Sequence, residues 1–187
     1  MTTYFTSDIH FGHTGVLEFA NRPFRSIEEH DDAMIENINA TVGKNDRLYI
    51  LGDFTMRFNS EDVQPYLNAI VCKNRWLIRG NHDQAGILCK PGAFVEVCDY
   101  KEIRIAGRKC CLSHYPFLDW NLAPIHNGVD LATSSYMLHG HIHSKRDSLN
   151  RQNASQGIWR YDVGMDANNY HPVSFEEIDE LFQKVMA

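Results

Sequence analysis

The chain has 187 residues, a formal net charge of −6 and a hydrophobic fraction of 43%. This length is sufficient for one domain with a sizeable core, so we expect residues 1–187 to form a single domain. The acidic balance excludes wholesale binding to nucleic acid or to an anionic membrane. No apolar run approaches the roughly 18 residues that a membrane-spanning helix requires, so we expect no membrane-spanning segment.

Five cysteines are present, an odd number without the spacing of a zinc ribbon. The N-terminus lacks a basic start followed by an apolar signal core. We therefore expect free thiols in a reducing cytoplasm.

Predicted strands and helices alternate in the first half of the chain. Short apolar runs predict strands at residues 3–7, 47–51 and 75–78, and the intervening patterns predict helices at residues 16–20, 26–42, 60–69 and 84–90. Ser26 and Glu29 form a capping box at the start of the longest of these helices. Strands that alternate with helices are typical of βαβ units with parallel strands.

The second half is richer in predicted strands. They fall at residues 94–98, 101–105, 109–113, 135–138 and 158–163, and an amphipathic helix follows the capping box of Ser174 and Glu177. Residues 115–134 are predicted to be an irregular loop, and residues 145–157 a polar surface turn. Consecutive strands favour a more antiparallel sheet. Two sheets packed face to face, with helices outside them, would accommodate both halves.

Metal-competent side chains follow five of the predicted strands. Carboxylate, amide and imidazole groups occur where each strand ends, at Asp8, His10, Asp53, Asn81, His114, His141 and His143. Strand ends that meet at one edge of a sheet place such side chains in one site. Residues two apart in an extended backbone point to the same side, so His141 and His143 can face the same ion.

This donor set favours two divalent cations. Oxygen and imidazole donors without thiolate suit Mn, Fe, Zn, Co or Ni better than Ca or a structural zinc. The set is too large for one such ion and suits two ions that share a bridging carboxylate. Two metals about 3.5–4 Å apart can clamp a phosphate and activate a bridging water at neutral pH. The sequence therefore predicts two divalent metal cofactors, with Mn²⁺ the first choice in vitro.

The order of the motifs resembles the calcineurin-like metallophosphoesterase superfamily. The complete motif set is present: Asp-x-His at 8–10, Gly-Asp at 52–53, Gly-Asn-His-Asp at 80–83, a lone histidine at 114 and Gly-His-x-His at 140–143. The flanking Asn-Arg-Pro-Phe and Asn-Asn-Tyr-His-Pro-Val resemble a group of small bacterial and phage phosphoesterases. The resemblance implies an α/β fold, a four-layer α/β/β/α sandwich of two mixed sheets flanked by helices.

The resemblance also implies roles for these residues. One metal would be held by Asp8, His10 and His143, and the other by Asn81, His114 and His141. Asp53 would bridge the two ions. His82 would not be a ligand; it would protonate the leaving alkoxide or steady the transferring phosphoryl group.

One position departs from the protein phosphatase branch of the superfamily. That branch has a second aspartate after Gly-Asp, which orients the catalytic histidine, and Met56 occupies this position here. Arg57 matches that branch's next arginine and could bind phosphate oxygens. The chain also has no insertion large enough for the cap of the superfamily's lipid-precursor hydrolases, so we expect an open site.

Four further residues are candidate substrate contacts, namely His13, Arg22, Arg57 and Trp120. Each also has a structural alternative: His13 in loop packing, Arg22 in bracing a turn, and Arg57 on the surface. Trp120 and the nearby Tyr115 could stack on a base or an aryl group, but aromatic side chains in a long loop also form small cores of their own.

The sequence favours a metal-dependent phosphoesterase in which a metal-bridging hydroxide attacks phosphorus and His82 assists the departing alcohol. Phosphodiesters are the first choice of substrate and phosphomonoesters the second. A non-catalytic metal-binding interaction scaffold is the alternative from another class, and the nuclease core of a larger assembly is a third. We expect a small phosphate-ester or nucleotide-like substrate, and neither a stable nucleic-acid complex nor a membrane partner.

Overall fold

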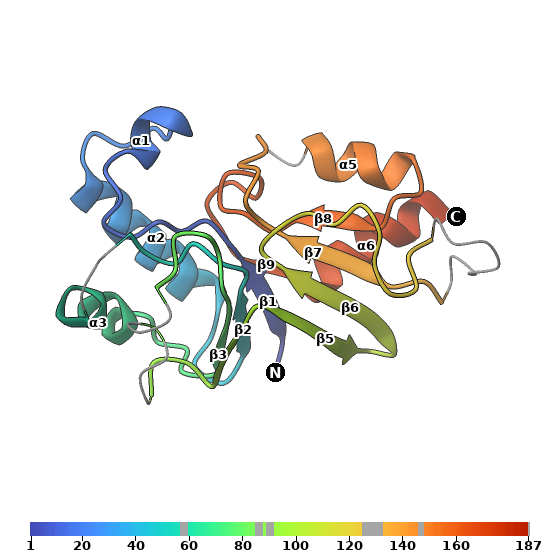
Figure 1. Cartoon of the computed structure of the whole chain (residues 1–187), viewed down its shortest axis with the longest axis horizontal. Coiled ribbons are helices and arrows are strands. Elements are labelled where there is room, and N and C mark those ends of the chain that lie inside the picture. The colour runs from blue at the N-terminus through green and yellow to red at the C-terminus, as the bar shows by residue number, and fades with distance from the viewer. Residues whose placement is uncertain (57–59, 85–87, 89–91, 125–132, 146–147, 187) are drawn as a thin grey trace.

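The computed structural model describes residues 1–56, 60–84, 88, 92–124, 133–145 and 148–186 (Figure 1). Its strands form two mixed sheets. The larger sheet has the order β4-β3-β2-β1-β9 and contains β1 (Thr3–Thr6), β2 (Arg47–Ile50), β3 (Arg75–Ile78), β4 (Glu96–Cys98) and β9 (Val173–Ser174). The smaller sheet has the order β5-β6-β7-β8 and contains β5 (Tyr100–Ile105), β6 (Arg108–Ser113), β7 (Tyr136–His139) and β8 (Arg160–Asp162).

Helices flank the two sheets (Figure 1). The larger sheet is accompanied by α1 (Val16–Phe19), α2 (Ile27–Thr41) and α3 (Ser60–Ala69), and the smaller by α5 (Ser148–Ser155) and α6 (Phe175–Met186). Met34 of α2 lies in one buried cluster with Leu48 of β2. Phe182 of α6 lies in the other, with its ring centroid 4.8 Å from that of Tyr136 of β7. The predicted α/β class, two mixed sheets with helices outside them, is confirmed.

Side chains along the strands of the larger sheet point alternately to its two faces, and apolar residues occupy both, so both faces are buried. Tyr49 of β2 stacks on Phe5 of β1 and Trp76 of β3, with ring centroids 5.6 and 4.8 Å away, in the cluster shared with the smaller sheet. The neighbouring residues Leu48 and Leu77 point the other way, into the cluster shared with α2 and α3. Side chains alternate across a strand, so these runs of apolar residues cover both faces.

Strand directions agree with the prediction in the first half and only partly in the second. β1 to β4 are parallel, as expected for βαβ units, and β9 joins β1 in antiparallel pairing. β5 and β6 are antiparallel, but β6, β7 and β8 are parallel. The connections 114–135 and 140–159 have the length that parallel crossovers need. The expectation of a more antiparallel sheet in the second half therefore holds for the pair of β5 and β6 and not for β6 to β8.

Residues 148–155 form helix α5, where a polar surface turn was predicted. Asn150 donates to the backbone oxygen of Asp162 at 3.0 Å and accepts from its backbone nitrogen at 2.7 Å, and Asn153 donates to the backbone oxygen of Arg160 at 3.0 Å. These amides pair with the free edge of β8, which would otherwise leave backbone groups unsatisfied. The helix is held by hydrogen bonds rather than by an apolar stripe, so hydrophobic periodicity did not reveal it.

Most other element boundaries agree with the prediction to within a few residues. The capping box at the start of α6 forms, since Ser174 exchanges hydrogen bonds with Glu177. At the start of α2, Ser26 accepts from the backbone nitrogen of Glu29, but the Glu29 carboxylate accepts from the backbone nitrogen of Arg25 instead of Ser26. The described cysteines are free thiols, while Cys89 and most of the helix predicted at 84–90 lie outside the described residues. Among the helices that are described, none combines the length and apolar character needed to cross a bilayer.

Candidate metal centre

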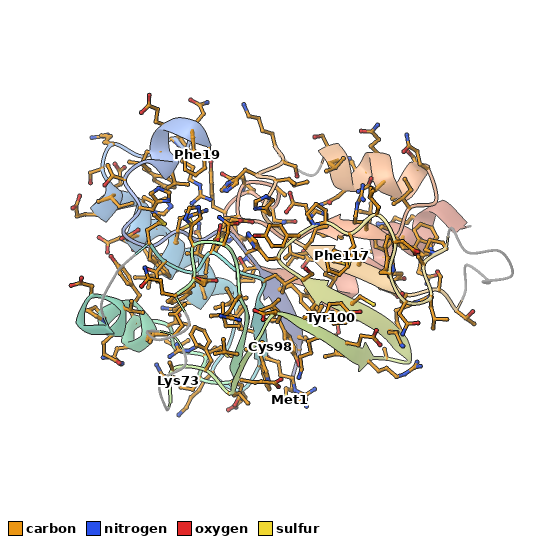
Figure 2. The ribbon with its side chains drawn as sticks, in the orientation of Figure 1. Met1, Phe19, Lys73, Cys98, Tyr100 and Phe117 are labelled. Atoms are coloured by element: carbon orange, nitrogen blue, oxygen red, sulfur yellow. The ribbon has the colours of Figure 1, made fainter. Side chains whose placement is uncertain are left out.

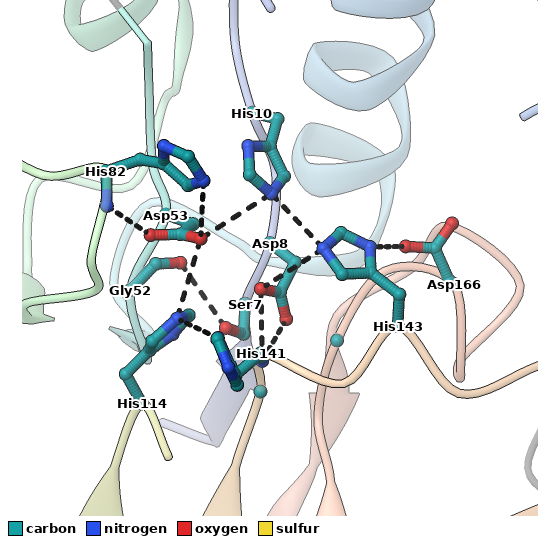
Figure 3. A network of polar contacts seen from close by, with 12 residues as sticks. Ser7, Asp8, His10, Gly52, Asp53, His82, His114, His141, His143 and Asp166 are labelled. Atoms are coloured by element: carbon teal, nitrogen blue, oxygen red, sulfur yellow. Dashed lines mark hydrogen bonds and ion pairs between the residues drawn. The ribbon is translucent and has the colours of Figure 1, made fainter. Parts of the chain in front are cut away.

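The seven candidate ligands converge because the strands before them end at the same edge of the sandwich. Figure 3 labels all of them except Asn81. Asp8, Asp53 and Asn81 follow β1, β2 and β3 of the larger sheet. His114 follows β6 of the smaller sheet, and His141 and His143 follow β7. A parallel β-bridge between Ser7 and Gly164 joins the two sheets beside this edge. Both sheets therefore contribute donors to one place.

Asp8, His10 and His143 form the first group of donors. The Nε2 atoms of His10 and His143 lie 3.3 Å apart, and His143 Nε2 lies 3.8 Å from Asp8 Oδ1. One donor atom from each of the three residues lies within 4.8 Å of the others. Asp8 and His10 are fully buried. The geometry suits a single cation between the three side chains.

A second group forms around His114. Its Nε2 lies 3.0 Å from Asn81 Oδ1, 3.2 Å from His141 Nδ1 and 3.5 Å from Asp53 Oδ2. His114 Nδ1 donates to the backbone oxygen of Leu51 at 2.8 Å, so its Nε2 is left with a lone pair. Asp53 Oδ2 also lies 3.6 Å from His10 Nε2, which places this carboxylate between the two groups.

The donor set fits two divalent cations of the type predicted from the sequence. Lone pairs of several imidazoles face one another and face carboxylate oxygens, an arrangement that a positive ion between them would stabilise. Asp8, Asp53 and His114 also bring donor atoms within 4.8 Å of one another, so the two groups share carboxylates.

The backbone is left-handed at five of the seven candidate ligands. The φ angles are 57° at Asp8, 59° at His10, 52° at Asp53, 74° at His141 and 45° at His143. Residues other than glycine adopt this conformation at a cost of about 1 kcal/mol or more each, and such strain clusters at functional sites. The sharp turns allow the side chains to point back over the ends of the strands instead of away from them.

Gly140 lets the two sheets approach each other at the centre. A Cβ atom at this position would lie inside the contact distance of Ser7 Oγ and Asp8 Oδ2. The backbone nitrogen of the next residue, His141, donates to both carboxylate oxygens of Asp8, at 2.9 and 3.1 Å. The glycine of the Gly-His-x-His motif is thus required by packing against the first strand.

Substituting Gly140 by alanine is expected to displace Asp8 and to weaken metal binding. We expect a loss of about 1–3 kcal/mol in the free energy of unfolding, as for other overpacked sites. Urea unfolding and metal content measured by elemental analysis check this. Gly43→Ala is the control, because its added Cβ would meet only the end of the Asp46 side chain, at 3.1 Å. A G140A protein with wild-type stability and metal content would contradict this account of the motif.

A chain of buried hydrogen bonds orients His143, and the sequence analysis missed one member, Asp166. His143 Nδ1 donates to Asp166 Oδ2 at 2.7 Å, which leaves Nε2 of His143 facing the centre (Figure 3). Arg22 donates to both oxygens of Asp166, at 3.0 and 2.8 Å, and to Nε2 of His30 at 2.7 Å. His30 must then carry its proton on Nδ1, which donates to Asp31 at 2.8 Å.

The charges along this chain stabilise one another. Burial alone would raise the pKa of Asp166, but hydrogen bonds from His143 and Arg22 outweigh burial and lower it to about 2. Burial likewise lowers the pKa of His143, but the bond to Asp166 and the charge of Asp8 raise it overall. Asp166 follows β8 at the same edge as the other donors. The expectation that polar side chains after strands gather in one site therefore applies to Asp166 as well.

Two of the four predicted substrate contacts are not supported by their positions. The Arg22 side chain is fully buried and also donates to the backbone oxygens of Asp8 and Ile9, so it braces the turn. Trp120 is 6% exposed, lies in the core beside the smaller sheet and donates to the backbone oxygen of Ser135. His13 is partly exposed, with its Nδ1 3.1 Å from that of His10. Arg57 lies outside the described residues.

His82 lies beside the ligands and reaches solvent. Its backbone nitrogen donates to Asp53 Oδ1 at 3.0 Å, its Nε2 lies 4.0 Å from Asp53 Oδ2, and its side chain is 34% exposed. The next residue, Asp83, accepts hydrogen bonds from the backbone nitrogens of Gly80, Asp53 and Phe54 at 2.8–2.9 Å. Asp83 therefore fixes the His82 loop to the Asp53 loop. Burial raises the pKa of the Asp83 carboxyl to about 6, and these backbone hydrogen bonds oppose that rise.

Burial also controls protonation inside the centre. Burial raises the pKa of Asp8 to about 8, an effect that the charge of His143 reduces only in part. Burial lowers the pKa of both His10 and His114, so these imidazoles are neutral at pH 7. Neutral imidazoles are the form that binds metals, whereas Asp8 must release a proton before its carboxylate can do so.

The free energy of unfolding of the metal-free protein is expected to fall as the pH rises from 6.5 to 8.5. The pKa of Asp8 is about 8 in the folded chain and ordinary, roughly 3.9, in the unfolded chain, so the folded state holds the extra proton. This stabilisation is full below the unfolded pKa and is lost as the pH passes the folded pKa, by up to about 2 kcal/mol over this window. Urea unfolding in EDTA checks this. The Asp8→Asn variant should show a smaller slope, to which the raised pKa of His143 still contributes, and identical slopes in both proteins would refute the assignment.

Two mixed sheets flanked by helices, with buried aspartate and histidine groups at the strand ends, define an α/β protein of the metallophosphoesterase class. The chain belongs to the calcineurin-like phosphoesterase family, whose model matches residues 1–184. The resemblance seen in the motifs is therefore confirmed.

Individual relatives come from archaea, phages and bacteria. The chain is 28% identical to an uncharacterized protein of Methanocaldococcus jannaschii, over 97% of this chain and 91% of that one. It is 30% identical to the gene 66 protein of Mycobacterium phage L5, over 76% of this chain and 77% of that one. A crystal structure of a protein of unknown function from Aquifex aeolicus superposes with a TM-score of 0.71 at 28% identity, covering 96% of this chain and 98% of that one.

Proposed function

We propose that this chain is a metal-dependent phosphoesterase that acts on phosphodiesters in preference to monoesters. The observation that carries the proposal is the convergence of seven oxygen and imidazole donors beside a partly exposed histidine, His82. One cation would be held by Asp8, His10 and His143, the other by Asn81, His114 and His141, with Asp53 shared. When bound, the ions would supply positive charge beside the phosphoryl oxygens and lower the pKa of a water molecule toward neutrality.

The side chains of the protein have separate tasks in this proposal. Water attacks phosphorus and gives up a proton to solvent, the bond to the ester oxygen breaks, and His82 donates a proton to that oxygen as it leaves. Asp53 positions the His82 loop through the backbone hydrogen bond of 3.0 Å. Asp166 and Arg22 keep the Nε2 atom of His143 directed at the centre. His13, beside both His10 and His82, stays a candidate for contact with the substrate, and so does Arg57.

The exposure of the candidate centre supports a preference for phosphodiester substrates. Asn81 and His141 are exposed and His82 and His143 partly exposed, so a phosphate with a substituent on each side has access. A monoester would leave part of such an open site without contacts.

Turnover of bis-p-nitrophenyl phosphate and p-nitrophenyl phosphate by protein loaded with Mn²⁺ tests the proposal. We expect release of p-nitrophenol from both, with the larger kcat/KM for the diester. A larger value for the monoester would reverse the stated preference. A protein that binds two ions and hydrolyses neither compound would instead fit a non-catalytic scaffold.

A further inference from the structure

A groove of about 470 Å³ opens next to the His114 side of the metal centre. Three aromatic residues, Tyr100, Tyr115 and Phe117, line it together with the ion pair of Arg79 and Asp99, and we call it the Tyr115 groove. Its volume is within the range of small-molecule sites, roughly 300–1,000 Å³. Figure 2 shows Tyr100 and Phe117 close together on the side of the smaller sheet.

The groove is continuous with the candidate ligands. Tyr115 directly follows His114, and its ring presents an edge-to-face contact to His114 and to His141, with centroids 5.1 and 4.7 Å away. Gly80 and Ser113, each adjacent in sequence to a candidate ligand, line the same groove. A group held against Tyr115 would therefore lie within a few ångströms of a phosphate at the centre.

The two tyrosines of the groove are exposed, whereas Phe117 is partly buried against the core. Tyr115 is 45% exposed and Tyr100 is 40% exposed. Tyr100 stacks on Phe117 with a centroid distance of 6.0 Å, and its hydroxyl donates to Glu102 at 2.9 Å, so these rings form a fixed wall. Fixed, exposed rings are suited to stacking on a flat aromatic group. The Arg79–Asp99 pair, at 2.6 Å, offers a donor and an acceptor beside that surface.

His82 and Tyr115 contact different halves of the centre. The His82 ring lies 5.3 Å from that of His10 and 5.5 Å from that of His13, whereas Tyr115 contacts His114 and His141. In the proposed reaction the leaving oxygen must be next to His82. The substituent that remains on phosphorus would then lie on the Tyr115 side of the centre.

We propose that the Tyr115 groove binds a planar aromatic ring, carried by the ester substituent that stays on phosphorus. This inference rests on the proposed phosphoesterase function and narrows its substrates to diesters that bear an aryl group or a nucleobase. Tyr115 supplies the stacking surface, and Tyr100 and Phe117 form the wall behind it. Tyr115 is thus a specificity-determining residue.

Three substrates with the same leaving group test the inference: p-nitrophenyl methyl phosphate, bis-p-nitrophenyl phosphate and thymidine 5′-(p-nitrophenyl phosphate). The substituent that remains is methyl, aryl or a nucleoside. With Mn²⁺-loaded protein, Tyr115→Ala is expected to raise KM about tenfold for the ring-bearing substrates, since one aromatic partner contributes about that much to base stacking. The methyl ester should change less than twofold. The aryl and thymidine esters show which kind of ring the groove prefers.

Matched variants separate stacking from general damage. Tyr115→Phe keeps the ring and should behave like the wild type. Phe19 is another exposed aromatic beside the centre, 57% exposed and 5.2 Å from the His143 ring, and it lies apart from Tyr100 and Phe117 in Figure 2. Phe19→Ala should change all three substrates by the same factor. An equal effect of Tyr115→Ala on all three substrates would overturn the inference and leave the phosphoesterase proposal intact.

A second readout does not depend on turnover. Saturation-transfer NMR on the EDTA-treated protein reports contact between the protein and the ring protons of bis-p-nitrophenyl phosphate. We expect a signal that Tyr115→Ala lowers severalfold and Phe19→Ala does not. An unchanged signal in Tyr115→Ala would overturn the inference. Failure of the phosphoesterase proposal would look different, because none of the three esters would then be hydrolysed.

Discussion

Replacing His82 by alanine is expected to lower kcat about 10²–10⁴-fold while both metals stay bound. The His82 side chain is 34% exposed and lies 4.0 Å from the shared carboxylate of Asp53, outside the close contacts that link the candidate ligands. Its removal would take away the proton donor for the leaving oxygen without opening the buried centre. Turnover of a diester with an ordinary alcohol as its leaving group and elemental analysis of the same sample measure the two effects together.

The leaving group provides a second check on His82. A good leaving group such as p-nitrophenolate needs little protonation, so the defect should be larger for an ester of an ordinary alcohol. His171→Ala is the control, because this histidine lies away from the centre, beside Thr41, and should leave activity unchanged. Loss of metal from His82→Ala would mean that His82 is a ligand and that its assigned role is wrong.

Replacing Asp53 by asparagine is expected to remove both metals together. Asp53 Oδ2 lies 3.6 Å from His10 Nε2 in one group of donors and 3.5 Å from His114 Nε2 in the other. Asparagine has nearly the same shape but no negative charge, so neither cation would keep a shared anion between them. We expect the metal content to fall from two ions toward none and turnover to fall with it.

Elemental analysis of Asp53→Asn dialysed at fixed Mn²⁺ decides the matter. Asp32→Asn, a substitution on an exposed part of α2, should retain the wild-type content and shows whether loss of one surface charge has any effect. Retention of one ion by Asp53→Asn would exclude a bridge. It would assign Asp53 to a single group of donors.

The candidate ligands were predictable because each follows an apolar run that can only be a buried strand. The run before Asp53, for example, is β2, whose residues Leu48 to Ile50 are buried. A buried strand ends at an edge of its sheet, so a polar side chain directly after it is a candidate member of a functional site at that edge. Asp166 obeys the same rule after β8, but no motif drew attention to it.

Features that depend on tertiary hydrogen bonds were not predictable from periodicity. Helix α5 carries buried asparagines where an apolar stripe would be expected, because Asn150 and Asn153 pair with the edge of β8. Arg22 is buried because Asp166, which is 144 residues away, pairs with it, as do His30 and the backbone oxygens of Asp8 and Ile9. A local pattern cannot show the pairing with Asp166. Trp120 and Tyr115 occur in the same loop, and only the fold determines that one is interior and the other exposed.

The candidate donors are divided between the two sheets, so a bound ion would also affect how firmly the sheets are held together. Asp8, Asp53 and Asn81 extend from the larger sheet, and the candidate histidines after β6 and β7 extend from the smaller. Along the rest of their length the sheets adhere through apolar packing, which is not directional. An ion coordinated by donors from both sheets would be a cross-link between the sheets at one edge of the sandwich, comparable to a covalent bond between them. Chelation would then loosen the sandwich from that edge inward, and supply of metal would govern rigidity as well as chemistry.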